Sequence, residues 1–404
     1  MRVLFLSFYF EPDLCAGSFR ATPLARALID ADPSLHLEVL TTQPNRYGTF
    51  IADADSIQQD GRLLVRRFSL PAHRSGMFDQ SRAFIAYAGQ VLRHVRGRSY
   101  DAVLATSSRL MTASLGSLIA RLKGLPLYLD VRDIFVDTIG DVLPARAARW
   151  AVGPFGLLER WTMRRACRIN LVSEGFRDYF AARYPRLPLS FFTNGIDDEF
   201  IGVDAAPPPG NRVDAATEVL YAGNIGEGQG LHLIIPVLAK RLPAFRFRVI
   251  GDGGRMGALR EVIGRQGLTN VILQPPVKRS ELVAASLKAD VLFLHLNDYP
   301  AFRKVLPSKL FEYGALGKPV WAGVGGYAAE FVRSEMENAE VFRPCDADGA
   351  LRAFARLRLQ PTERPAFIAR YARSEITQRL AADILTAFKG NHAAVEGLRS
   401  QRPT

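Results

Sequence analysis

The chain of 404 residues is predicted to be an α/β protein with two doubly wound, parallel-sheet domains. Short apolar runs alternate with helical patterns in its first half, as in folds of strand–helix–strand units. A stretch from Asn194 to Ala215 that is rich in Pro, Gly and Asp then breaks regular structure, and the same alternation restarts after it. The length also favours two domains, because one hydrophobic core rarely organises more than about 300 residues.

The strands of the first domain are expected at its short apolar runs. These runs are Val3–Phe8, Leu37–Leu40, Leu63–Val65, Ala102–Ala105, Leu127–Val131 and Ile169–Val172. Between them, Phe84, Tyr87, Val91 and Val95 recur at helical spacing, which predicts an amphipathic crossover helix.

The strands of the second domain are predicted in the same way. Their runs are Val219–Ala222, Phe245–Ile250, Val271–Leu273, Val291–Leu294 and Pro319–Ala322. The predicted boundaries are a first domain at 1–195, a linker at 196–216, a second domain at 217–375, and a segment at 376–404 whose helix crosses back to the first domain and ends in a tail. Because open α/β sheets bind ligands at the carboxyl ends of their strands, we expect the site in a cleft between the domains.

Composition narrows the class of protein. The apolar fraction of 48% and charged fraction of 23% are typical of a globular protein. Cys15, Cys167 and Cys345 lie far apart, which favours neither disulfides nor a metal cluster and indicates a reducing, cytoplasmic environment. The apolar residues 1–10 lack a cleavage signal and are interpreted as a strand. No apolar run reaches the roughly 18 residues of a membrane span.

The net charge of +12 comes mostly from 44 arginines. Zinc-finger spacing and aromatic RNA-binding motifs are missing from the sequence, so nucleic acid is not the expected partner. Nucleotide phosphates or an anionic membrane face explain the charge better. A membrane contact is predicted for Pro144–Arg168, which mixes aromatic and aliphatic residues with arginines, and Pro154 is expected to split it into two helices. The alternative is a pair of helices packed on the first domain with solvated arginines.

Glycine-containing turns follow the first strand of each predicted domain. They are Phe10–Ser18, which holds Gly17, and Gly223–Gly230, and a further turn at Gly251–Gly254 follows the strand that ends at Ile250. Glycine lets backbone amides approach a phosphate, and the next helix adds the positive end of its dipole. Each turn alone is equally compatible with a purely structural role.

The segment Leu306–Pro319 contains the residues that say most about ligand binding. Pro307 and Ser308 predict a helix start, which points free amides and Lys309 at an anion, while Glu312 lies one turn further along. A carboxylate so placed can accept two ribose hydroxyls. The alternative is a solvated helix that happens to carry a Lys and a Glu.

Ordered motifs in both halves resemble the family 4 retaining glycosyltransferases. Those of the second half are Gly223-Asn224-Ile225-Gly226, Gln229-Gly230-Leu231, Gly251-Asp252-Gly253, Pro307–Tyr313 and Gly317-Lys318-Pro319. Those of the first half are Phe10-Glu11-Pro12-Asp13, Asp130-Val131-Arg132-Asp133 and Asn194-Gly195-Ile196-Asp197. The most similar branch resembles bacterial surface-polysaccharide enzymes of the N-acetylfucosaminyltransferase (WbuB-like) type.

The resemblance implies the GT-B architecture, in which two Rossmann-like doubly wound domains face a central cleft. It implies a hexosyl or N-acetylhexosaminyl transferase that retains configuration without a metal or other cofactor. The first domain would bind a glycan or polyprenyl-linked acceptor and the second a nucleotide-sugar donor, with UDP as the nucleotide. The enzyme would be cytoplasmic, peripheral on the inner face of the cell membrane, and part of surface polysaccharide or lipopolysaccharide biosynthesis.

The site residues follow from the resemblance. The catalytic residues would be Arg132 and Asp133, where the family often has a His; Asp133 would position hydroxyls while the departing phosphate takes the acceptor proton. The donor-binding residues would be Gly17, Gly223, Asn224, Gln229, Gly251, Gly253, Lys304, Ser308, Lys309, Leu310 and Glu312. For Asp133, capping of the next helix is the alternative.

The sequence departs from the family at the donor site. Lys304 stands where the first glutamate of the family's Glu, seven residues, Glu motif falls, and Asn224 and Gln229 replace an Arg and a Lys. Lys309 and Lys304 are the expected substitutes. These departures keep open a catalytically silent GT-B partner protein; a GT-B nucleotide-sugar epimerase, which would need an acid and a base, is the other alternative. The pairs Asp30/Asp32, Asp53/Asp55 and Asp346/Asp348 match a metal-binding spacing but are interpreted as surface residues.

Overall fold

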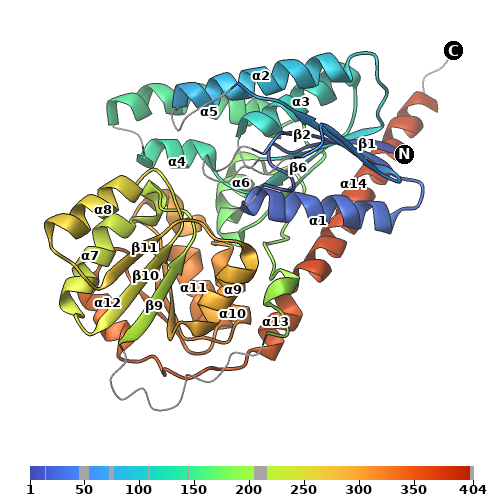
Figure 1. Ribbon diagram of the computed structural model, residues 1–404. Helices are drawn as coiled ribbons and strands as arrows, with labels where there is room; N and C mark the ends of the chain where they lie inside the picture. The colour runs from blue at the N-terminus through green and yellow to red at the C-terminus, as the bar shows by residue number, and fades with distance from the viewer. Residues whose placement is uncertain are drawn as a thin grey trace. The chain divides into compact units, whose positions relative to one another are not determined.

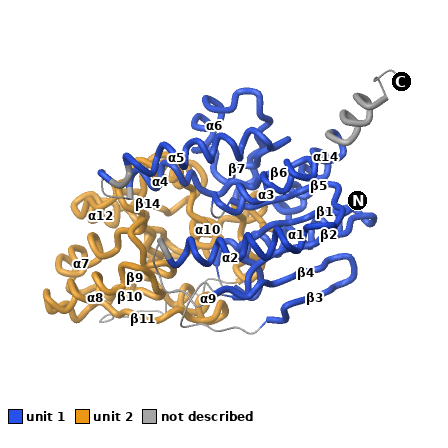
Figure 2. The backbone as a smooth tube through the Cα atoms, turned by 90° about the horizontal axis from the view of Figure 1, so that it is seen from above, with its two compact units in different colours: residues 1–193, 374–404 blue, residues 194–373 orange. Residues whose placement is uncertain are grey.

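The computed structural model describes residues 1–13, 15–44, 54–71, 77–107, 110–142, 145–203 and 216–400. They form two compact units: unit 1 comprises Met1–Thr193 and Ser374–Thr404, and unit 2 comprises Asn194–Arg373 (Figure 2). Each unit has its own sheet, and these two sheets confirm the predicted α/β fold class. Residues 194–203 of the region around the predicted linker belong to unit 2, and residues 204–215 lie outside the described part of the chain.

Unit 1 is built on an eight-stranded sheet with the order β3-β4-β2-β1-β5-β6-β7-β8. Figure 1 labels β1, β2 and β6 of this sheet. Among the strands that the structure describes in this sheet, only the β3–β4 pair is antiparallel. The strands are β1 (Arg2–Leu6), β2 (His36–Thr42), β3 (Ile57–Asp60), β4 (Leu63–Phe68), β5 (Ala102–Thr106), β6 (Leu127–Val131), β7 (Arg168–Leu171) and β8 (Leu189–Ser190). The helices are α1 (Ala16–Ala31), α2 (Met77–Val95), α3 (Leu110–Lys123), α4 (Phe135–Val142), α5 (Ala145–Met163), α6 (Arg177–Arg183) and α14 (Arg373–Ser400).

The six predicted strands and the predicted amphipathic helix of unit 1 are confirmed. The central strands are buried along their whole length because helices cover both faces of a parallel sheet. On α2 the predicted residues Phe84, Tyr87, Val91 and Val95 are all buried. The direction of the strand order reverses between β1 and β5, which is the switch point where such sheets bind ligands.

Helix α14 packs into the core of unit 1 from the far end of the sequence. Leu380, Ile384 and Phe388 are buried in the same cluster as strands β1, β2 and β5. Asp383 lies beside them and accepts hydrogen bonds from the Tyr128 hydroxyl at 2.7 Å and the Ser190 hydroxyl at 2.8 Å. The unit is therefore completed only by residues that follow unit 2 in the chain.

Helix α5 corrects one sequence expectation. Pro154 lies inside one helix, Ala145–Met163, rather than between two. Proline removes one backbone donor, but Pro154 is exposed, so water can satisfy the carbonyl that loses its partner. Arg165 and Arg168 are used within unit 1: Arg165 donates to the Leu125 carbonyl at 2.6 Å and Arg168 pairs with Asp383. Pro144 lies outside the described residues.

Unit 2 has a six-stranded, all-parallel sheet with the order β11-β10-β9-β12-β13-β14. The strands are β9 (Thr217–Ala222), β10 (Phe245–Ile250), β11 (Val271–Gln274), β12 (Val291–His295), β13 (Val320–Gly323) and β14 (Ala339–Phe342). The helices are α7 (Leu231–Arg241), α8 (Met256–Arg265), α9 (Arg279–Lys288), α10 (Lys309–Ala315), α11 (Gly326–Glu335), α12 (Ala347–Phe354) and α13 (Pro365–Tyr371). The five predicted strands are present, and the switch point lies between β9 and β12.

The two ends of unit 2 pair with each other. The Ile196 N–H donates to the Tyr371 carbonyl at 2.8 Å, and the Arg373 N–H donates to the Ile196 carbonyl at 2.9 Å. The Arg373 guanidinium also binds the Asp197 carboxylate and the Gly195 carbonyl. These contacts fix the segments through which the chain enters and leaves unit 2.

Three of the acidic residues with metal-like spacing, Asp32, Asp346 and Asp348, make contacts within the described residues. Asp32 binds Ser34 and Lys389, Asp346 accepts from the Gly349 N–H at the start of α12, and Asp348 pairs with Arg241. Asp53 lies outside the described residues. Among the helices that the structure describes, none has the length and apolar character needed to cross a membrane.

Candidate active site

The candidate donor site of unit 2 begins at the turn after β9. Gly223 has φ of 142°, a conformation that favours glycine, and a Cβ added there would overlap the ammonium of Lys309. Lys309 is the first residue of α10, with Ser308 as its N-cap residue, and this confirms the predicted helix start. Lys309 therefore lies across the first turn at the switch point of the sheet, where its position depends on glycine at 223.

The ammonium of Lys309 has no hydrogen bond or ion pair within the described residues of the chain. Its Nζ lies 5.6 Å from the ring centroid of Tyr221, a weak cation–π contact. Burial lowers the pKa of Lys309, and the nearby Glu312 opposes that shift. A half-buried cation without an acceptor is a place where an anion can bind.

Glu312 lies one turn further along α10 and faces Arg279. Its side chain is 15% exposed, its carboxylate is 3.7 Å from the Arg279 guanidinium, and it has no hydrogen bond in the described part of the chain. Burial raises the pKa of Glu312, against the pull of Arg279 and Lys309. Its oxygens thus keep their capacity to accept hydrogen bonds from a ligand.

Arg279 is in turn fixed by Asp197, which also binds Arg373. The chain of charges therefore runs Arg373, Asp197, Arg279, Glu312, with alternating signs. Sequence reasoning missed Arg279: it opens α9 as one arginine among many, and only the fold brings it to Glu312. Asp197 belongs to a motif quoted above, but nothing in the local sequence identifies its two partners.

Asn224 and Gln229 shape the turn itself. The Asn224 side-chain amide donates to the Gln229 side-chain oxygen Oε1 at 2.7 Å, and the same oxygen accepts from the Gly226 N–H at 3.1 Å. The Asn224 carbonyl accepts from the Tyr221 hydroxyl at 2.6 Å. The pair that replaces the family's two cations therefore forms a neutral brace across the turn.

Four other predicted donor-site residues, Gly251, Gly253, Leu310 and Lys304, lie in different surroundings. Gly251 has φ of 148° and Gly253 has φ of 159°; an added Cβ would overlap the carbonyl of Gly223 or of Ile225, so both serve the packing of neighbouring turns. Leu310 is fully buried and packs in the core. Lys304 ends the 3₁₀ segment Pro300–Lys304 and is half-buried.

His295, at the end of β12, contacts the backbone of the Gly223–Gly230 turn. Its Nδ1 lies 2.7 Å from the backbone carbonyl oxygen of Gln229, and its Nε2 accepts from the Cys345 N–H at 2.9 Å, so the neutral ring carries its proton on Nδ1. Burial lowers the pKa of His295 to about 4. Sequence reasoning missed this histidine because its partners lie 66 and 50 residues away.

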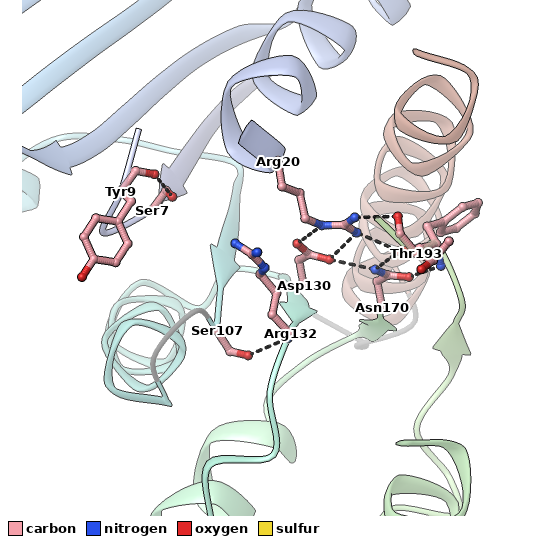
Figure 3. Close-up of polar contacts among 9 residues, drawn as sticks. Ser7, Tyr9, Arg20, Ser107, Asp130, Arg132, Asn170 and Thr193 are labelled. Carbon is pink, nitrogen blue, oxygen red and sulfur yellow. Dashed lines mark hydrogen bonds and ion pairs between the residues drawn. The ribbon is translucent and has the colours of Figure 1, made fainter. Parts of the chain in front are cut away.

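Unit 1 has a buried ion pair where α1 meets the sheet (Figure 3). Arg20 binds both oxygens of Asp130 at 2.7 and 2.8 Å and donates to the Thr193 and Phe192 carbonyls at 2.8 Å. The Asn170 amide also donates to Asp130 at 2.7 Å. Burial alone would raise the pKa of Asp130, but Arg20 and Asn170 hold it below its usual range. This network anchors the chain as it leaves unit 1.

Arg132 and Asp133 follow β6 directly. The Arg132 N–H donates to the Ser107 hydroxyl at 3.2 Å, whereas its guanidinium has no bond drawn to it in Figure 3 and its buried Nε lacks a partner among the described residues. Its Nη1 would lie 3.4 Å from a Cβ added at Gly17, so the guanidinium reaches the first turn of the unit. Burial and the charge of Arg20 lower its pKa. Asp133 is exposed.

The structure thus places the predicted residues in two groups, one in each unit. Arg132 and Gly17 meet in unit 1, whereas Gly223, Asn224, Gln229, Lys309 and Glu312 gather in unit 2. Each group lies at the carboxyl ends of strands beside a switch point.

Comparisons with known proteins agree with this arrangement. Residues 18–195 match the glycosyl transferase 4-like domain, and residues 205–375 match the glycosyl transferases group 1 domain. A curated relative, the putative colanic acid biosynthesis glycosyl transferase WcaI of Escherichia coli, is 26% identical over 230 residues. That alignment covers 54% of this chain and 56% of the relative, so the chain spans little more than half the length of that protein.

Solved structures share the fold over nearly the whole chain. Sucrose-phosphate synthase from Thermosynechococcus elongatus is 12% identical with a TM-score of 0.66, covering 99% of this chain and 100% of the other. Anabaena HepE, solved with UDP-glucose, is 15% identical with a TM-score of 0.59, covering 98% of this chain and 100% of the other. These neighbours confirm the GT-B fold, while the specific WbuB-like branch stays a prediction. The two matched domains together span most of the sequence, and the chain belongs to the group 1, family 4 glycosyltransferases.

Proposed function

We propose that this protein transfers a hexosyl or N-acetylhexosaminyl group from a UDP-sugar to a glycan or polyprenyl-linked acceptor in surface polysaccharide biosynthesis, with retention of configuration. One observation carries the proposal. Lys309 and Glu312, on the same face of α10, are half-buried opposite charges, and neither side chain has a hydrogen bond within the described residues. Such a pair suits a ligand that carries an anion and hydroxyls side by side.

The donor fits this pair part by part. A diphosphate would take the Lys309 ammonium and the backbone of the Gly223 turn, which the Asn224–Gln229 brace holds open. A ribose would donate its two hydroxyls to the Glu312 carboxylate, which Arg279 keeps oriented. Lys304 is proposed as a second cation for the diphosphate. No metal is needed in this scheme, because protein cations meet the phosphate charge.

The transfer step is assigned to unit 1. Arg132 presents a guanidinium with no described partner, and Asp133 next to it is exposed. We propose that Asp133 orients acceptor or sugar hydroxyls and that Arg132 stabilises the charge on the departing phosphate. The bond from the anomeric carbon to the phosphate breaks, a bond to the acceptor oxygen forms on the same face, and the hydroxyl proton passes to the phosphate, which leaves as UDP.

The relatives support the choice of donor and pathway. HepE was solved with UDP-glucose, and the E. coli relative is named for colanic acid biosynthesis. A cytoplasmic enzyme that meets a lipid-linked acceptor at the inner face of the cell membrane fits this assignment. The sugar and the acceptor are to be identified by screening nucleotide sugars for turnover.

Calorimetric titration with UDP, UMP and uridine, with and without EDTA, tests the donor site. A charged hydrogen bond contributes about 1.5 to 3 kcal/mol, so Glu312→Ala should weaken UDP and uridine binding roughly ten- to 150-fold. Lys309→Ala should weaken UDP binding by a similar factor and leave uridine binding nearly unchanged. Lys288→Ala removes an exposed lysine of the same unit and is the matched control.

Two outcomes would contradict the assignment. Loss of UDP binding in EDTA would show that a metal carries the diphosphate. Equal affinity for uridine and UDP would show that Lys309 does not meet a phosphate, and it would favour the catalytically silent alternative.

A further inference from the structure

One face of α5 carries large apolar side chains that unit 1 does not cover. Trp150 is 82% exposed, Leu157 66% and Trp161 37%. They are seven and four residues apart, so on a helix they lie within about 40° of one another. This is a continuous apolar strip rather than a scatter of single residues, and such strips mark interaction surfaces.

The opposite face fixes the orientation of α5. Glu159 is buried and accepts hydrogen bonds from the Tyr179 hydroxyl at 2.9 Å and the Tyr184 hydroxyl at 3.1 Å. Thr162 is fully buried and shares a hydrogen bond of 2.8 Å with Ser114 of α3. Because these polar contacts would be lost if the helix turned, the apolar strip stays outward.

Positive charge borders the strip. Arg146, Arg149 and Arg160 are exposed on α5, and Arg164 is exposed just beyond its end. The one acidic residue of α5, Glu159, is buried, so every exposed charge that the structure describes on this helix is positive. An acidic protein surface would match the charge, but only a lipid surface offers both anionic groups and a layer that takes up tryptophan and leucine.

The neighbouring helix α3 extends the surface. The Arg121 guanidinium lies 4.7 Å from the ring centroid of Trp161 and donates to the Trp161 carbonyl at 2.8 Å. Leu122, the next residue, is 73% exposed. An arginine stacked on an exposed tryptophan keeps the ring in place, and such aromatic rings are typical of the membrane–water interface.

We propose that this face of α5 binds an anionic lipid bilayer, with Trp150, Leu157 and Trp161 in the headgroup region and the four exposed arginines on the lipid phosphates. This proposal rests on the proposed function and deepens it, because it names the surface through which the enzyme would meet the membrane; that surface shares no residue with the candidate donor site. It replaces the broader sequence prediction, because Arg165 and Arg168 are used inside unit 1.

The test is sedimentation of the full chain with vesicles of phosphatidylcholine containing about 30% phosphatidylglycerol, compared with phosphatidylcholine alone. Binding should require the anionic lipid and fall with salt. Trp150→Ser with Leu157→Ser, and separately Arg146, Arg149, Arg160 and Arg164 all to Gln, should each weaken binding at least tenfold. The matched control is Leu233→Ser with Val237→Ser, an exposed apolar pair on α7 of unit 2, 46% and 38% exposed, which should bind as wild type.

Tryptophan emission supplies an independent readout. Trp321 is fully buried, so a shift to shorter wavelength on adding vesicles must come from Trp150 or Trp161. Unchanged sedimentation of both sets of variants would overturn the proposal. So would a concentration-dependent dimer that the Trp150→Ser, Leu157→Ser variant dissolves, because the strip would then bind a second copy. UDP titration of the same variants should match wild type, which separates this outcome from failure of the donor site.

Discussion

Replacing Gly223 by alanine should prevent Lys309 from binding a diphosphate, although Lys309 itself is unchanged. The added methyl group would occupy the place of the ammonium, and the displaced atoms are the far end of a flexible side chain. Unit 2 should therefore still fold, at a cost of about 1 to 3 kcal/mol for alanine in a backbone conformation suited to glycine. Lys309, pushed out of the turn, would no longer reach a bound diphosphate.

The loss of one charge-assisted hydrogen bond, about 1.5 to 3 kcal/mol, corresponds to a roughly ten- to 150-fold weaker affinity for UDP. The assay is calorimetric titration of UDP and uridine into wild type, Gly223→Ala, Lys309→Ala and the double variant. If both single changes act through one ammonium, the double variant should bind UDP no more weakly than either alone. Uridine affinity should change little in all of them.

Gly254→Ala is the control, because its backbone is in an ordinary conformation and no atom lies within 4 Å of the added Cβ. The reasoning would be refuted if folded Gly223→Ala bound UDP as tightly as wild type. It would also be refuted if the losses in the double variant simply added, since that would mean two separate effects on the ligand.

Two further predictions concern other parts of the site. Asp133→Asn should lower the turnover number about ten- to a hundredfold while UDP affinity stays within twofold, because the residue belongs to unit 1; unchanged turnover in a folded variant would assign Asp133 to helix capping. Folding lowers the pKa of His295 from 6.5 to about 4, so the stabilisation by its neutral ring is complete above pH 6.5 and declines as the pH falls toward 4. At pH 5 the free energy of unfolding should be about 2 kcal/mol lower than at neutral pH because of this histidine. Urea unfolding at pH 7.5 and 5.0 should show a smaller loss of unfolding free energy for His295→Asn than for wild type. An equal loss in both proteins would argue against His295 as its source.

The fold could be predicted from sequence because its central strands are continuous apolar runs. Each of the eleven predicted runs became a strand, whereas the exposed β3, the two-residue β8 and the half-buried β14 carry no such signal and were missed. Pro154 was interpreted wrongly because the cost of a helical proline depends on whether its unpaired carbonyl meets water, and the sequence does not show that.

The candidate site could be predicted only where it is local. Lys309 and Glu312 share one turn of one helix, so their spacing alone brings them together. Arg279, Asp197 and His295 act through partners tens of residues away, and a chain with 44 arginines gives no hint which of them matters. The Arg20–Asp130 pair, separated by 110 residues, is invisible for the same reason.

The return of α14 to unit 1 has a consequence for synthesis on the ribosome. Unit 2 is one uninterrupted stretch and can close its core as soon as residue 373 has emerged. Unit 1, although it is made first, lacks Leu380, Ile384 and Phe388 until synthesis has passed residue 388. Until then, the apolar residues of unit 1 that pack against α14 stay exposed to solvent. The usual order, in which the N-terminal domain finishes folding first, is therefore reversed. Nascent unit 1 is thus the part of this protein that a chaperone would have to shield.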